Sequence, residues 1–219
     1  MGAVKAVVVV ASNRAADGVY EDESGPILAE GLRTRGFDVV GPVVVHDGEE
    51  VEAALRVAVG DAADLVVTSG GTGLTSKDLT PEMTSRVVDY EVPGIAEAIR
   101  AAGLAKTPHA ALSRGIAGVA ERTLIVNLAG SKGAAKDGLA VLTAELVEHA
   151  VSQLHDGDHD RGEGGGEPAE GDAPNSGPGH AAESAAAGGA APGRGAAHTS
   201  DTGIAGPSHP GIDDGRTTA

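Results

Sequence analysis

The segment "TSGGTGLTSKDLTPE", residues 68–82, carries the clearest structural signal in the chain. The apolar run "LVV" immediately precedes it, and three glycines follow within four positions, at Gly70, Gly71 and Gly73. Glycine permits positive φ and lets backbone N–H groups approach a phosphate closely. Pro81 suits the first turn of a helix. The segment therefore predicts a buried strand, a glycine-rich turn and a following helix.

Strand-like and helix-like patterns alternate on both sides of this turn. Apolar runs predict strands at residues 4–12, 37–45, 63–69 and 121–130. Helical spacing predicts a helix at 25–36, one through Val51, Leu55 and Ala58, one from Pro81 with Met83, Val87 and Tyr90 on one face, one through Ile95, Ile99 and Ala102, and a last one with the apolar stripe Leu139, Leu142, Leu146, Ala150, Val151 and Leu154. This alternation predicts an α/β fold with a mostly parallel sheet covered on both faces.

The apolar pattern stops near residue 155. Beyond Leu154 the only large aliphatic residues are Ile204 and Ile212, and Gly, Ala, Pro, Asp and Glu dominate. Such a segment cannot bury enough apolar surface to offset its chain entropy. We therefore expect one domain at residues 1–155 and a disordered tail at residues 156–219.

The composition argues against several classes of protein. The 219 residues carry a formal net charge of −16 and no run of clustered Lys and Arg, so a nucleic-acid platform is not expected. The first apolar run is too short to span a membrane, so we expect no membrane partner. Cysteine is absent, which excludes thiolate metal sites and catalytic thiols and fits a cytoplasmic location.

Two carboxylates follow predicted strands and are candidate ligands of Mg²⁺. Sites in parallel α/β sheets lie beyond the carboxyl ends of the strands. Asp47 follows the second predicted strand, and Asp78 lies in the loop after the third. Since Thr80 can cap the next helix, Asp78 is free for another role. Mg²⁺ takes one or two carboxylates together with substrate phosphate oxygens.

Each of these signals also has a purely structural interpretation. A glycine-rich turn can be a tight connection between strand and helix, and Asp78 can be a solvated loop residue. Asp47 with Glu50 also fits a capping box for the following helix. The polar residues after the other strands, namely Ser12, Asn13 and Arg14, Ser113 and Arg114, and 127–131, are ordinary turn chemistry when each is taken alone.

Together these segments resemble the molybdopterin-binding family of MoaB/Mog-type adenylyltransferases. The signature is residues 68–82, and the remaining motifs, which stand in the family's order, are "SNRAADGVYEDESGPILAE", "VVVHDGEEV", "VPGIAEAIR", "ALSRGIAG" and "LIVNLAGS". The match covers about residues 3–154. The resemblance implies a three-layer α/β/α fold, a homotrimer, and Mg²⁺-dependent adenylyl transfer from ATP to molybdopterin that yields adenylyl-molybdopterin and pyrophosphate.

The resemblance also assigns roles to residues of this chain. The family's two essential aspartates, which would hold Mg²⁺, correspond to Asp47 and Asp78. The residues that it implies for substrate binding are Ser12, Arg14, Ser69, Gly70, Gly71, Thr72, Gly73, Ser113, Asn127, Gly130 and Ser131. The chain departs from the family at Ala129, where a proline is usual. Proline would restrict that loop through its fixed φ.

Three alternatives to adenylyl transfer remain open from the sequence. A MoaB-type relative can bind molybdopterin without transferring AMP. A nucleotide hydrolase of the competence-damage type has a related fold and needs no pterin. An interaction scaffold of the gephyrin kind would use the tail as a binding arm, but the tail lacks hydrophobic anchor motifs.

Overall fold

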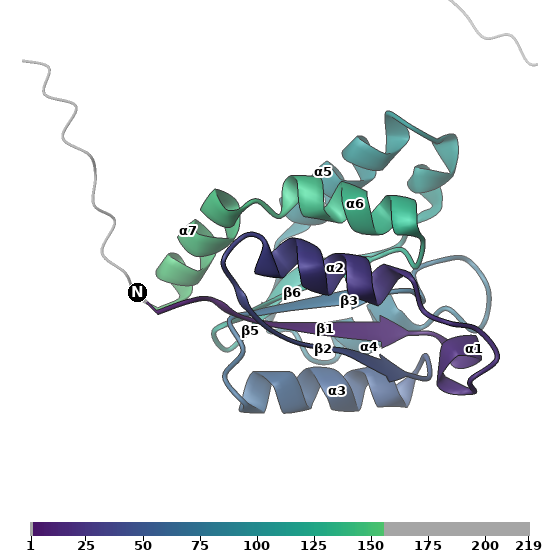
Figure 1. Cartoon of the computed structure of the whole chain (residues 1–219), viewed down its shortest axis with the longest axis horizontal. Helices are drawn as coiled ribbons and strands as arrows, with labels where there is room; N and C mark the ends of the chain where they lie inside the picture. Colours follow the sequence, from purple (N-terminus) through teal and green to yellow (C-terminus); the bar gives the residue numbers. More distant parts are fainter. Residues whose placement is uncertain (1, 156–219) are drawn as a thin grey trace, which may run out of the picture. The chain divides into compact units, whose positions relative to one another are not determined.

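The computed structural model describes residues 2–155, and these residues form a six-stranded sheet with helices on both faces (Figure 1). The strands are β1 Lys5–Ala11, β2 Asp38–Val45, β3 Leu65–Ser69, β4 Tyr90–Glu91, β5 Ala117–Ala120 and β6 Thr123–Leu128. The predicted disorder of residues 156–219 lies outside the described residues.

The sheet is mostly parallel, as predicted. Its strand order is β2-β1-β3-β6-β5-β4. β1 pairs in parallel with β2 and β3, and β3 pairs in parallel with β6. β5 runs antiparallel to both of its neighbours, β6 and β4. The carboxyl ends of β1, β2, β3 and β6 therefore meet at one edge of the sheet.

Helices cover the sheet in two layers. They are α1 Asn13–Ala16, α2 Ser24–Arg33, α3 Glu49–Gly60, α4 Thr80–Ser85, α5 Pro93–Leu104, the 3₁₀ helix η1 Pro108–Leu112, α6 Lys132–Val141 and α7 Ala144–Leu154. Buried residues of α2, α5, α6 and α7 form one apolar cluster, and buried residues of α3 and α4 form the other. Figure 1 shows α2 and α6 on the face opposite α3. The three-layer α/β/α prediction is confirmed. None of the helices in residues 2–155 is long and apolar enough to cross a membrane.

Burial explains why the central strands read as continuous apolar runs. Every residue of β3 and of β6 is buried. A strand covered on both faces has no polar side, so its sequence does not alternate. The edge strand β2 has no fully buried residue, and Val40 and Val43 are 61% and 42% exposed.

Three predicted elements differ from the structure. The last apolar stripe belongs to two helices, because the chain turns at Leu142 and α7 starts anew after Thr143. The helix from Pro81 ends at Ser85, and Tyr90 lies in β4 instead of on its face. Ser113 and Arg114 do not follow a strand as predicted, because they lie between η1 and β5, and the segment 111–118 contains the start of β5.

Candidate functional site

The glycine turn after β3 has a backbone that only glycine tolerates. Gly70 has φ +104°, and a Cβ there would lie 2.2 Å from the carbonyl oxygen of Ala11. Gly71 has φ +62°, and its Cβ would lie 2.1 Å from Asp47 Oδ2. L side chains rarely adopt such φ values. The turn therefore lies directly against the end of β1 and against the carboxylate of Asp47.

Asp47 is bound to the segment that starts α4. Its Oδ2 accepts the backbone N–H of Leu79 and its Oδ1 accepts the Thr80 hydroxyl, both at 3.1 Å. Partial burial raises the pKa of Asp47 above its ordinary value, and the nearby Asp78 charge adds to that rise, while the Leu79 and Thr80 hydrogen bonds oppose it. The carboxylate thus links the end of β2 to the loop after β3.

These contacts correct both capping predictions. The N-cap of α3 is Gly48, which has no side chain to cap it, and the carboxylate of Glu50 accepts the N–H of His46 at 2.9 Å. The N-cap of α4 is Leu79, and Thr80 lies inside the helix with its hydroxyl donating to Asp47. Both predictions fail for one reason. The Asp47 carboxylate points toward the start of α4 instead of toward α3, and there it accepts the Thr80 hydroxyl.

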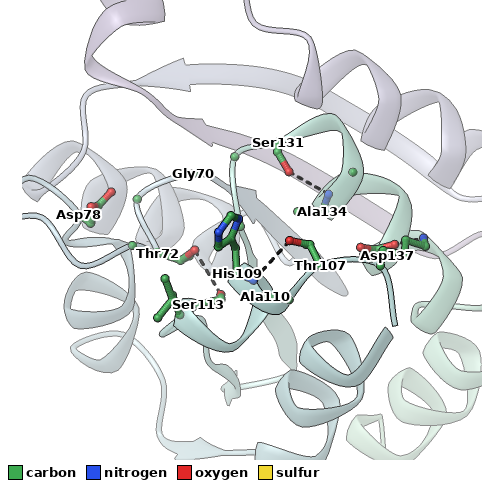
Figure 2. A pocket seen from close by; sticks show the side chains of 17 residues that line it. Gly70, Thr72, Asp78, Thr107, His109, Ala110, Ser113, Ser131, Ala134 and Asp137 are labelled. Carbon is green, nitrogen blue, oxygen red and sulfur yellow. Dashed lines mark hydrogen bonds and ion pairs between the residues drawn. The ribbon is translucent and has the colours of Figure 1, made fainter. Parts of the chain in front are cut away.

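Asp78 closes a small turn of its own. Its Oδ2 accepts the backbone N–H of Thr75 at 2.9 Å and the Thr75 hydroxyl at 2.6 Å. A Cβ on Gly73 would lie 2.9 Å from the same oxygen. The side chain lines the large cavity at this end of the sheet (Figure 2).

This cavity has a volume of about 500 Å³ and collects most of the predicted site residues. Those that line it are Gly70, Gly71, Thr72, Gly73, Asp78, Ser113, Gly130 and Ser131. Ser113 donates its hydroxyl to the buried Thr72 hydroxyl at 3.3 Å. Ser131 caps α6 by accepting the N–H of Ala134 at 3.1 Å. Ser131 and Ala134 both line the cavity, so the first turn of α6 faces it (Figure 2).

A second, smaller cavity of about 90 Å³ shares two residues with the first, Gly70 and Gly130. Ser12 and Ser69 line it. The hydroxyl of Ser12 accepts the N–H of Ala15, and that of Ser69 donates to Ser24 Oγ at 2.9 Å. The two cavities therefore adjoin across the backbone of Gly70 and Gly130.

Three predicted residues line neither cavity. Arg14 stacks over the ring of Tyr20, with its Cζ 5.3 Å from the ring centroid. Asn127 is buried, and its amide bonds Thr68, Thr84 and Ile116, so it ties β6 to β3 and α4. Asp47 lies next to the large cavity, behind Gly71.

The opposite wall of the large cavity is formed by residues that no sequence pattern predicted. That wall includes Lys106, Thr107, His109 and Asp137. Figure 2 shows Asp78 and Asp137 at opposite ends of the site, with His109 between them. Asp137 is buried and forms an ion pair with Lys106. Pro108 starts η1 after α5, and no pattern in the sequence connects this segment to the glycine turn.

The chain matches a known family of proteins. The family described as "Probable molybdopterin binding domain" matches residues 7–149. The chain belongs to this family. The match includes both aspartates and the whole glycine turn, so the resemblance inferred from the motifs is confirmed.

Curated relatives agree with the assignment. A molybdopterin adenylyltransferase of Pyrococcus furiosus is 37% identical over 65% of this chain and 89% of its own length, and one of Escherichia coli is 34% identical over 69% and 81%. A molybdenum cofactor biosynthesis bifunctional protein of Synechococcus elongatus is 34% identical, with 73% of this chain aligned. The chain spans about half the length of that bifunctional protein.

Solved structures share the fold. The Mog protein of Mycobacterium ulcerans is 51% identical, with a TM-score of 0.67 over 71% of this chain and 99% of that chain. The MoaB enzyme of Thermus thermophilus is 39% identical, with a TM-score of 0.64 over 69% and 96%. The sheet and its helices are therefore those of the Mog and MoaB structures.

Proposed function

We propose that the chain is a molybdopterin adenylyltransferase of molybdenum cofactor biosynthesis. A phosphate oxygen of molybdopterin attacks the α-phosphorus of ATP. The new P–O bond forms as the bond to the β-phosphate oxygen breaks, and the products are adenylyl-molybdopterin and pyrophosphate. The names of the curated relatives at 34% and 37% identity support this activity.

The pair of adjoining cavities is the observation that carries the proposal. The large cavity, at about 500 Å³, has the size of a small-molecule site, and the small cavity, at about 90 Å³, extends it by room for a small group such as a phosphate; Gly70 and Gly130 line both. Bare backbone at the boundary lets phosphates approach N–H groups closely. The first turn of the ten-residue helix α6 faces the same place, and helix N-termini favour phosphate.

Asp78 offers a ligand for a Mg²⁺ site that the substrates would complete, and Asp47 lies behind Gly71 with each carboxylate oxygen already accepting one hydrogen bond. Both hydrogen bonds described for the Asp78 carboxylate fall on Oδ2, so Oδ1 remains for a cation. Within residues 2–155 no group of three or more His, Asp or Glu side chains could hold a metal ion, so phosphate oxygens would supply the remaining ligands. Bound Mg²⁺ would neutralise phosphate charge during transfer.

The protein's own contribution is positioning. The glycine turn and α6 orient the phosphates, Thr72 and Ser113 offer hydroxyls in the larger cavity, and Asp47 holds the start of α4 against the turn. Adenylyl transfer needs little covalent help from a protein, because orientation and charge stabilisation supply most of the rate.

We also propose a cytoplasmic homotrimer. Support for assembly comes from an apolar groove between β2 and α3, where Val43 and Val57 are 42% and 63% exposed. Exposed apolar patches of this kind mark interaction surfaces. Light scattering should give three times the mass of one chain. The absence of cysteine supports a reducing compartment.

The decisive experiment measures pyrophosphate release from ATP with and without molybdopterin. Adenylyl transfer predicts release that requires both molybdopterin and Mg²⁺, with adenylyl-molybdopterin as a product. Molybdopterin binding without pyrophosphate release would identify a binding protein instead. Nucleotide breakdown that is independent of molybdopterin would identify a hydrolase.

A further inference from the structure

Arg114 contacts both ends of the loop that carries Asp78. Its backbone N–H donates to the carbonyl of Thr72 at 2.9 Å, and its Nε donates to the carbonyl of Gly73 at 2.7 Å. Its Nη2 donates to the backbone carbonyl of Asp78 at 2.6 Å. A single residue from the segment before β5 therefore bonds the first and the last residues of this loop.

The loop between these points has little other support. Residues 74–77 are exposed, and Leu74 is 65% exposed. Because these residues are not held in place by burial, hydrogen bonds must fix the conformation of the loop. The bonds between Asp78 and Thr75 stay inside the loop and move with it. The Arg114 side chain is about one-third exposed, so its bonds are only partly open to competition from water.

The charge of Arg114 also acts on the site. Its Nη1 forms an ion pair with Glu82 in the first turn of α4. The Glu82 carboxylate raises the pKa of Arg114, and the charges of Asp78 and Asp47 add to this effect. The guanidinium of an arginine is charged at any working pH, and here its positive charge offsets part of the repulsion between the two aspartates.

We infer that Arg114 is a positioning residue for adenylyl transfer, because it holds the loop 72–78 so that the Asp78 carboxylate faces the cavity. The catalytic part of this inference rests on the proposed function, but the positioning of the loop does not. Lysine cannot replace Arg114, since one ammonium group lacks the planar fork that reaches two carbonyls and a carboxylate together.

Proteolysis tests the positioning of the loop without any substrate. Lys77 lies exposed within it, so a lysine-specific protease reports its release. We expect Arg114→Gln to speed cleavage after Lys77 by about tenfold or more, the scale of losing charge-assisted hydrogen bonds. Arg86→Gln is the matched control, because Arg86 pairs with Glu52 beyond the other end of α4. Cleavage of Arg114→Gln at the wild-type rate would overturn the inference.

Single-turnover kinetics test the catalytic part. In both Arg114→Gln and Arg114→Lys, the transfer rate should fall by about tenfold or more while the Kd of molybdopterin changes by less than about threefold. If Arg114 only stabilised the fold, the folded fraction of each variant would transfer AMP at the wild-type rate. It would also resist cleavage after Lys77 as well as the wild type does. Wild-type transfer by Arg114→Lys would contradict the inference.

Two further results keep the outcomes distinct. If the wild-type protein does not transfer AMP, the proposed function fails, while the proteolysis still decides whether Arg114 positions the loop. If Arg114→Gln does not fold, Glu82→Gln provides the test, since it removes one anchor of Arg114 and leaves the arginine in place. Glu82→Gln should speed cleavage after Lys77 in the same direction but less, and unchanged cleavage would count against the inference.

Discussion

Gly71 shows at the scale of one residue how the site is built around a missing side chain. Its φ of +62° is unfavourable for any L residue, and a Cβ there would collide with Asp47 Oδ2 and Thr80 Oγ1 at 2.1 and 2.3 Å. Gly71→Ala should therefore cost ~1–2 kcal/mol for the left-handed backbone and a further ~1–3 kcal/mol for the collision. Chemical denaturation measures the sum.

Gly18→Ala is the matched control for this substitution. Gly18 has a similar φ of +70°, but nothing lies within 4 Å of its Cβ position. It should cost only the backbone strain, about 1–2 kcal/mol. Equal destabilisation by the two substitutions would show that Asp47 and Thr80 move aside freely and do not press against the turn.

Asp78→Asn separates the charge of the carboxylate from its shape. Asparagine can still accept the Thr75 bonds through its amide oxygen, so folding should be unaffected. Without the charge, transfer should fall by ~100-fold or more, which is the scale for losing a preorganised charge-stabilising group. Molybdopterin binding should stay close to that of the wild type. Kinetics of pyrophosphate release and a binding titration measure the two effects.

The control for Asp78→Asn is Asp38→Asn, at the exposed amino end of β2 and far from the cavity edge of the sheet. It should transfer like the wild type. Near-normal transfer by Asp78→Asn would rule out a charge-based role for Asp78. An equal loss of binding and transfer would show that Asp78 mainly holds a ligand.

At the scale of elements, the break between α6 and α7 depends on a cap that the apolar stripe concealed. Thr143 Oγ1 accepts the N–H of Leu146 at 3.2 Å and starts α7. Thr143→Ala should destabilise the protein by about 1 kcal/mol, the usual cost of losing an N-cap, and Thr143→Ser should restore most of it. Denaturant titration measures the difference. A neutral Thr143→Ala would mean that packing alone fixes this boundary.

Helices α3 and α4 are joined by a pH-dependent contact. The carboxylate of Glu52 accepts hydrogen bonds from Arg56 and Arg86, which hold its pKa below the ordinary 4.5. A lowered pKa contributes stability above the unfolded-state pKa, and this contribution is lost as the pH falls through the folded-state value. Glu52→Gln should therefore lower the melting temperature slightly at pH 7, and the difference should shrink as the pH falls below 4.5 and through the lowered folded-state pKa of Glu52. A difference that persists in acid would point to packing instead of charge.

At the scale of the whole molecule, residues 2–155 contain both apolar clusters and both cavities. Residues 156–219 contain only Ile204 and Ile212 as large aliphatics, so they can add little hydrophobic stabilisation. A chain ending at His155 should keep its melting temperature within a few degrees and retain its activity. Calorimetry and the transfer assay measure both. A large loss of either would show that the tail interacts with the domain.

Local patterns in the sequence were sufficient where one segment decides its own conformation. The apolar runs of β1, β3 and β6 and the glycine turn at 70–73 were predicted correctly, because burial in the sheet interior and positive φ each select a residue type directly. The edge strand β2 was predicted from its β-branched valines alone, since none of its residues is fully buried. The N-cap of α7 was not predicted, because Thr143 lies between Leu142 and Leu146 and leaves their helical spacing intact. The strand β5 was missed because its four residues, "AGVA", carry no clear pattern of their own.

Short contiguous motifs were enough to predict the fold class, the family and the glycine turn with Asp78 beside it. Four features of the site depend on long-range contacts instead: the direction of the Asp47 carboxylate, the burial of Asn127, the wall formed by Lys106 and Asp137, and the hydrogen bonds of Arg114 to the loop. These features join residues that stand 31 to 59 positions apart. Their geometry exists only once the parallel strands bring their carboxyl ends to one edge, and no local pattern encodes it.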